Sequence, residues 1–185
     1  MDIIADLSKD SSAMKLAAPD RRSLKTRAAL RAAFRDLLLE RGYDGVQVGD
    51  VSDRADVGRS TFYEHFSSKS ALLRASLDVP FNHMAGMALP TASPQDIIPW
   101  LLHFREHQQV VRLLLGWPTR PILSQVLTEA IARRLPQGQG ITARLIADAQ
   151  LALLDIWILG RPACTLDEAA AIVRNSSAAL AVAAE

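Results

Sequence analysis

The sequence predicts an all-α protein in which a small N-terminal helical head is joined to a larger helical body. Apolar residues recur every three or four positions over most of the chain, and no segment shows the strict alternation of a β-strand. Gly and Pro interrupt the periodic segments at 116–118, 136–140 and 160–162, where helices are expected to end. The 185 residues, of which 49% are hydrophobic, supply enough apolar surface for a globular core.

The head is expected to begin after an N-terminal arm. Residues 1–20 mix charged residues with Ser and Ala and end at a Pro-Asp pair that favours a helix start, so we expect them to be disordered. From Arg22 to Arg41 apolar residues share one helical face and arginines fall on another, which predicts the first helix. Gly42 then ends this helix.

Two short helices are predicted at 48–55 and 59–66, on either side of a tight turn at 56–58. A helix-turn-helix of this form allows its second helix to enter the major groove of DNA while the first braces it across the backbone. Phe62 and Phe66 lie four residues apart on the side of the second helix that faces the first helix of the head, so both are assigned to the core.

A further helix is expected to start near Lys69, because Ser67 and Ser68 offer an N-cap, and to end or kink at Pro80. We therefore place the head at 21–79 and the body at 80–185. The periodic segments of the body predict helices at about 95–115, 119–135, 141–160 and 166–183.

The composition indicates the cellular environment of the protein more than its chemical activity. The net charge is +1, but residues 21–74 hold 11 Lys and Arg against 7 Asp and Glu, a weak indication of a polyanionic partner. Cys164 is the only cysteine, which excludes an intrachain disulfide. The N-terminus has no export signal, and no run approaches the roughly 18 apolar residues of a membrane span. We expect a soluble, cytoplasmic protein without a membrane partner.

Residues 42–73, GYDGVQVGDVSDRADVGRSTFYEHFSSKSALL, resemble the helix-turn-helix and following helix of the TetR (tetracycline-repressor) family. The family usually shows Gly-Tyr/Phe, Asp-Ile-Ala, Ala-Gly-Val-Ser, Thr-Phe/Leu-Tyr, His/Tyr-Phe and Ser-Lys at these intervals, and the resemblance extends over about residues 21–78. It implies a TetR-like fold, with a three-helix DNA-binding head and a helical ligand-binding and dimerisation body. The implied function is that of a ligand-responsive regulator, usually a repressor, which binds a palindromic operator in double-stranded DNA as a homodimer.

The resemblance also assigns roles to residues of the head. Arg59 and Ser60 open the recognition helix as the expected base readers, since Arg can bond two acceptors of one guanine, and Tyr63 is expected to reach a base as well. The expected phosphate contacts are Thr61, His65, Lys69, Gln47, Arg22 and Lys25. Gln47, Gly49 and Asp56 depart from the family pattern. Because Asp tolerates left-handed backbone, the turn at Asp56 is expected to form.

The last two predicted helices are expected to form a dimer. The segment 141–160 is apolar on nearly all sides, so one of its faces is expected to meet a partner subunit, and small residues line one stripe of the last helix. The resemblance to the TetR family implies that these two helices form a four-helix bundle across a two-fold axis. The residues assigned to this interface are Leu153, Trp157, Ala169, Val173 and Leu180.

Aromatic and soft apolar residues between the head and these helices predict a pocket for a small-molecule effector. Its expected lining is Phe81, Met84, Met87, Trp100, His103, Phe104 and Trp117. His103 and His107 have chelating spacing with Glu106 adjacent, but no third ligand is recognisable, so neither a metal nor another cofactor is expected.

Two alternatives remain at this stage: a dimeric ligand-binding protein of the same fold that has lost DNA binding, and a metal-dependent hydrolase built on Glu106 and the two histidines. No nucleophile motif or phosphate loop supports catalysis, so the chain is not expected to be an enzyme.

Overall fold

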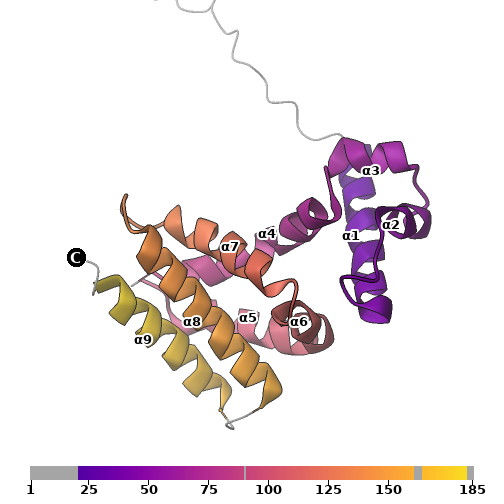
Figure 1. Ribbon diagram of the computed structural model, residues 1–185. Helices are drawn as coiled ribbons and strands as arrows, with labels where there is room; N and C mark the ends of the chain where they lie inside the picture. Colours follow the sequence, from indigo (N-terminus) through magenta and orange to yellow (C-terminus); the bar gives the residue numbers. More distant parts are fainter. Residues whose placement is uncertain (1–20, 90, 161–163, 183–185) are drawn as a thin grey trace, which may run out of the picture.

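A computed structural model describes residues 21–89, 91–160 and 164–182, and within these ranges the chain holds nine α-helices and no strand, which confirms the all-α prediction (Figure 1). The predicted N-terminal arm, 1–20, lies outside the described residues. The helices are α1 (Arg21–Arg41), α2 (Val48–Arg54), α3 (Arg59–His65), α4 (Lys69–Met87), α5 (Pro94–Glu106), α6 (Gln108–Leu115), α7 (Arg120–Ala132), α8 (Gly140–Leu159) and α9 (Leu166–Val182).

The head consists of α1, α2, α3 and the first turns of α4, packed around a small apolar core. Helix α1 ends at Arg41 because Gly42 takes a φ of 69°, as the sequence predicted. The core residues of the head are almost fully buried: Leu30, Phe34, Leu37, Leu38, Val46, Val51, Phe62, Phe66, Leu72 and Leu73. This core fixes the angle between α2 and α3, and ion pairs from Arg54 to Glu40 at 2.8 Å and from Arg41 to Asp50 at 3.5 Å join α1 to α2 at the surface.

The turn between α2 and α3 depends on Asp56, whose φ of 53° lies in the left-handed region. The backbone N–H of Val57 then donates to the Ser52 carbonyl at 3.0 Å, so the turn is closed by a main-chain hydrogen bond. The expectation that Asp supports this conformation in place of Gly is confirmed.

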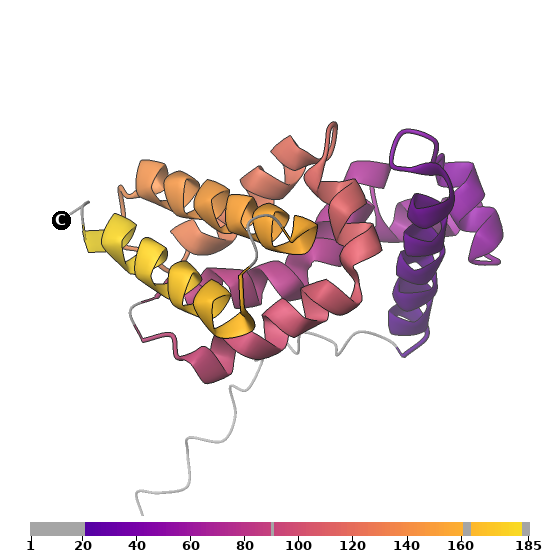
Figure 2. The same ribbon diagram turned by 90° about the horizontal axis from the view of Figure 1, so that it is seen from below.

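Helix α4 runs without interruption from the head into the body, passing through Pro80 (Figures 1 and 2). Of the two predicted alternatives, an end or a kink at Pro80, the end is therefore wrong. Proline removes one backbone hydrogen bond at a cost of about 3 kcal/mol in a helix interior. The burial of Phe81, Met84 and Met87 directly after it continues the helix against the body and offsets that cost. The domain boundary expected near 79 thus falls inside a helix.

The single helix expected at 95–115 is in fact two helices, α5 and α6, which meet at His107. The backbone of His107 departs from helical values, with φ −103° and ψ 23°. Its ring Nδ1 donates to the His103 carbonyl at 3.0 Å, since a carbonyl oxygen can only accept. Apolar periodicity continues through this break and therefore gave no sign of it.

In the body α7 packs against α4 and α8, and α9 lies antiparallel to α8. The head lies at the end of the molecule away from the C-terminal end of α9 (Figure 2). Arg74 on α4 donates to both carboxylate oxygens of Glu129 on α7, at 2.7 and 2.8 Å. Arg112 on α6 reaches the Ile158 carbonyl of α8 at 2.9 Å. Across the described ranges no helix is both long and apolar enough to span a bilayer.

Candidate nucleic-acid interface and internal cavity

Helix α3 has one buried and one exposed face. Phe62 and Phe66 are 0% and 4% exposed and anchor the helix on the head, which confirms their assignment to the core. Arg59 and Ser60 are exposed at its first turn, and Tyr63 is 57% exposed one turn later. Thr61 and His65 are half-buried at the edges of this face. The three side chains expected to read bases therefore share one accessible surface.

Gly49 on α2 makes room for Arg59. A Cβ atom at position 49 would lie 3.1 Å from Arg59 Cζ, closer than ordinary van der Waals contact, so the guanidinium rests directly against the α2 backbone. The sequence indicated only that Gly49 departs from the family pattern. The structure instead gives it a positioning effect on Arg59, which no local pattern indicates.

Lys69 is held by the loop between α1 and α2. Its Nζ donates to the carbonyls of Tyr43 at 2.7 Å and Val46 at 2.8 Å and lies 4.2 Å from the centre of the Tyr43 ring. Burial lowers the pKa of this ammonium below its usual value, with a smaller opposite effect from Asp44. Lys69 thus orders the loop that precedes α2, a role that the family resemblance did not assign.

The remaining expected phosphate contacts are also exposed residues of the head. Gln47 is exposed just before α2, and its backbone N–H donates to Asp50 at 3.0 Å. Arg22 and Lys25 are exposed on the first turns of α1. Arg27, which the sequence placed on a solvated face, lies 4.7 Å from the centre of the Phe66 ring and reaches the His65 carbonyl at 3.5 Å. It supports the end of α3 from α1.

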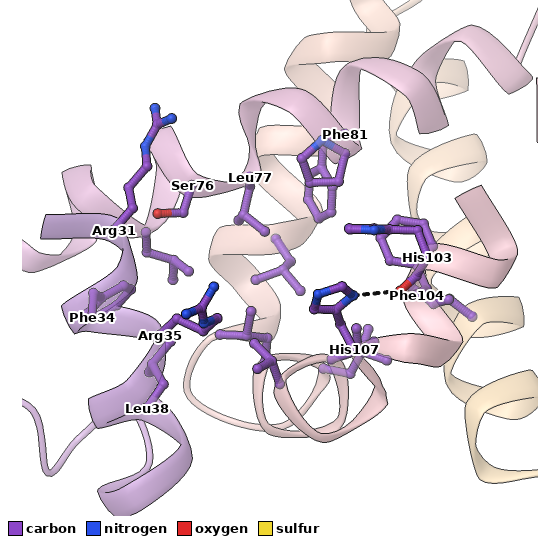
Figure 3. A pocket seen from close by; sticks show the side chains of 18 of the residues that line it. Arg31, Phe34, Arg35, Leu38, Ser76, Leu77, Phe81, His103, Phe104 and His107 are labelled. Carbon is purple, nitrogen blue, oxygen red and sulfur yellow. Dashed lines mark hydrogen bonds between the residues drawn. The ribbon is translucent and has the colours of Figure 1, made fainter. Parts of the chain in front are cut away.

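A cavity of about 430 Å³ lies where α1 of the head meets the body (Figure 3). Helix α1 provides one wall through Phe34, Leu38 and neighbouring residues, and α4 to α8 provide the rest. Of the predicted pocket residues, Phe81, His103 and Phe104 line it. The contribution of α1 was not foreseen, because its apolar face was accounted for by the core of the head.

The other residues predicted for the pocket lie elsewhere. Met84 and Met87 line a separate void of about 10 Å³ against α8 and α9. Trp100 stacks on His83, with ring centres 3.9 Å apart. Trp117 is 84% exposed in the α6–α7 connection. Aromatic composition alone does not reveal the direction in which a side chain points from its helix, and Trp117 lies outside any helix.

Basic and neutral polar groups line the cavity from more than one side: Arg31 and Arg35 from α1, Ser76 from α4, and His103 and His107 from α5 and its end. Burial lowers the pKa of His103, and the nearby His107 lowers it further. Ligand atoms of His103, Glu106 and His107 lie within 4.8 Å of one another. Glu106, which the sequence placed next to the two histidines, thus lies close enough to them to be a third ligand, although both it and His107 are exposed.

The expected dimer residues are largely enclosed within the protomer. Trp157, Ala169 and Val173 are 9%, 0% and 4% exposed. Ala169 and Val173 are small residues that permit close packing of α9 within its own chain, and Leu153 and Leu180 are half-buried. A different apolar stripe faces outward on α8 and α9, made of Ile141, Leu145, Ile156, Leu159 and Ile172, which are between 42% and 80% exposed.

The same architecture recurs in known proteins. A TetR-family regulator from Streptomyces coelicolor superimposes with a TM-score of 0.65 over 90% of this chain and 99% of its own, at 15% identity. The HTH-type transcriptional repressor Rv3405c from Mycobacterium tuberculosis is 31% identical over 156 residues, which cover 78% of this chain and 81% of the relative.

Other matches cover shorter parts of the chain. The family profile described as "Bacterial regulatory proteins, tetR family" matches residues 30–76. YxbF, an uncharacterized HTH-type transcriptional regulator of Bacillus subtilis, is 39% identical over 59 residues, which cover 31% of this chain and only 16% of the relative. A second regulator from that organism, YdeS, is likewise matched over only 37% of its length.

A helix-turn-helix held on a small core and joined to a helical body defines the class of helix-turn-helix transcriptional regulators. Within that class, the chain belongs to the tetR family of bacterial regulatory proteins.

Proposed function

We propose that the protein is a ligand-responsive repressor that binds a palindromic operator as a homodimer. The observation that carries the proposal is the division of α3, where Phe62 and Phe66 are buried while Arg59, Ser60 and Tyr63 are exposed. An exposed helix face with an Arg at its first turn suits a major groove, where Arg bonds guanine O6 and N7 in parallel. Arg22, Lys25 and Gln47, which are exposed on the same head, are the proposed phosphate contacts, which position the helix without specifying sequence.

The outward stripe of α8 and α9 supports the dimer. Ile141, Leu145 and Ile156 follow one another at near-integral helical turns, and an apolar surface of this kind is stabilised by pairing with a second copy. A two-fold dimer holds two recognition helices about 34 Å apart, so that they reach half-sites one helical turn from each other.

The cavity supports a response to a ligand, because α1 forms one of its walls and also belongs to the head. A molecule that fits the cavity in only one arrangement of head and body shifts the population toward that arrangement. Repression is favoured by the relative named a transcriptional repressor, which matches over most of both chains. A regulator of this type acts on the chromosome, so we place it in the cytoplasm.

The decisive experiment is selection of bound duplexes from a random library, combined with light scattering on the purified chain. We expect enrichment of an inverted repeat and a mass of two chains. The same selection with Arg59, Ser60 and Tyr63 all changed to Ala is the control, and it should enrich nothing. A monomer that selects no sequence at micromolar concentration would contradict the proposal and favour the ligand-binding protein without DNA affinity.

A further inference from the structure

The cavity beside α1 has an uneven distribution of charge. Among the described residues that line it, two are arginines, two are histidines and none is acidic. The arginines lie on α1, in the head, whereas the histidines lie at the end of α5, in the body. A molecule in this cavity therefore meets positive or hydrogen-bond-donating groups from both halves of the protein.

Arg35 is the best placed of these groups. Its guanidinium points from α1 toward His107 across the cavity (Figure 3). Its ion pair with Asp36, 3.1 Å long, joins side chains that are 53% and 48% exposed, and such exposed pairs contribute little stability. A carboxylate in the cavity would compete with Asp36 for Arg35 without breaking a strong contact. Arg31 lies at the rim, and its Nε is buried without a hydrogen-bond partner.

His107 presents a defined ring orientation on the opposite side. Its Nδ1 donates to the His103 carbonyl at 3.0 Å, which leaves Nε2 as the atom available to a ligand (Figure 3). A carboxyl group next to this nitrogen can share one proton with it in a hydrogen bond.

The rest of the cavity is apolar. Leu73, Leu77 and Phe81 of α4, Phe104 of α5, and Leu151 and Leu154 of α8 provide aliphatic and aromatic surface. The volume of about 430 Å³ lies within the usual range for small-molecule sites, about 300 to 1,000 Å³. A compact apolar chain or ring system fits this part, but a fully polar metabolite would lose its hydration there without replacement.

We propose that the effector is an amphipathic carboxylate, whose anionic group binds between Arg35 and His107 while its apolar part fills the space lined by Leu77, Phe81 and Leu154. This assignment rests on the proposed ligand-responsive function and specifies the chemistry of the ligand. The carboxylate joins α1 of the head to the end of α5 in the body. The ligand therefore favours the head–body arrangement in which both groups reach it.

The experiment is isothermal titration calorimetry of the full chain with decanoate, with decan-1-ol as the uncharged probe and decylammonium as the cationic one. A chelator in the buffer removes any contribution of a metal at the histidines. We expect decanoate to bind about tenfold more tightly than decan-1-ol, the effect of one hydrogen bond to a charged group, and decylammonium to bind most weakly. Added salt should weaken decanoate and leave decan-1-ol unchanged.

Three variants locate the site. Arg35→Gln should reduce decanoate affinity about tenfold and leave decan-1-ol affinity unchanged. Arg133→Gln removes an equal charge from an exposed position at the end of α7, outside the cavity lining, and should change neither affinity. Leu77→Phe fills part of the apolar space and should weaken both probes, with circular dichroism used to verify its fold.

Each outcome decides the inference. Equal binding of the three probes, or loss of decanoate affinity in Arg133→Gln as large as in Arg35→Gln, overturns it, and so does the absence of decanoate binding. The salt comparison on the unmodified chain decides it even if a variant does not fold. Operator selection without decanoate tests the regulatory proposal separately. If an operator is selected but decanoate does not bind, only the proposed ligand class is refuted. If decanoate binds with the expected charge selectivity but no operator is selected, only the proposed DNA regulation is refuted.

Discussion

We propose that Arg59 provides most of the sequence specificity of α3. It is exposed at the first turn, and its guanidinium rests on the α2 backbone in the space that Gly49 leaves open. This contact restricts the side chain before DNA is bound, so less conformational freedom is lost when it meets a base. Ser60 and Tyr63, on the same face of the helix, have uncharged side chains.

Arg59→Ala should therefore lower operator affinity by about 1–3 kcal/mol and relax one base position in each half-site, because a bidentate base contact is lost. Fluorescence anisotropy over a set of single-base operator variants measures both effects. The matched control is Arg133→Ala, which removes the same charge from the exposed end of α7. An operator profile for Arg59→Ala identical to that of the unmodified protein would remove Arg59 from base reading.

Substitution of Lys69 and substitution of Lys25 are expected to have different effects, although both residues are lysines of the head. Lys69 donates to two backbone carbonyls, so Lys69→Ala should lower the free energy of unfolding by about 1–3 kcal/mol in urea denaturation. Lys25 is exposed, so Lys25→Ala should leave stability unchanged and reduce the salt dependence of DNA binding by about one ion per subunit. If Lys69→Ala had unchanged stability and showed the salt effect expected of Lys25→Ala, Lys69 would be a phosphate contact without a structural role.

Among the elements, those with local signals were predicted well from the sequence. Gly42, Asp56 and Ser68 each fix the backbone through their own chemistry, and the first helices lie where these residues place them. The passage of α4 through Pro80 and the break at His107 depend on packing against distant helices, which local periodicity does not contain. For the same reason the contribution of α1 to the cavity and the exposure of Trp117 could not be predicted.

The faces of α8 and α9 show the same limit of prediction from local sequence. Both helices carry apolar residues on more than one face, and the sequence does not say which face a protomer keeps for itself. Ala169 and Val173 are buried within the protomer, which leaves Leu145 and Ile156 on the outer stripe of α8.

We expect the double variant Leu145→Glu and Ile156→Glu to be a monomer, with a dimer dissociation constant raised on the order of 100-fold or more, because each interface would enclose unpaired charges. Light scattering over a dilution series measures the shift. Leu113→Glu, at an apolar position of α6 that is 41% exposed, is the control and should remain dimeric. If the double variant stayed dimeric, the interface would have to lie on another face.

In the whole molecule, the proposed ligand site and the proposed DNA site share α1. Its buried face supports α3 through the core of the head, and its residues Arg31, Arg35 and Leu38 line the cavity. Helix α4 connects the two halves without a break, so a change in the angle between head and body moves α3 together with α1 as one unit. In a dimer, such a movement changes the separation of the two recognition helices.

The two ligands should consequently oppose each other by the same factor. Decanoate at saturation should weaken operator binding about 5- to 150-fold, the usual range of allosteric coupling, and operator at saturation should weaken decanoate by an equal factor, because both paths end in the same ternary complex. Anisotropy with and without decanoate, and calorimetry with and without operator, measure the two factors independently. Arg35→Gln should reduce both together, since the charged link between α1 and His107 is lost. Two factors that differ beyond error would show that decanoate acts outside the equilibrium between these two sites, for example by dissociating the dimer.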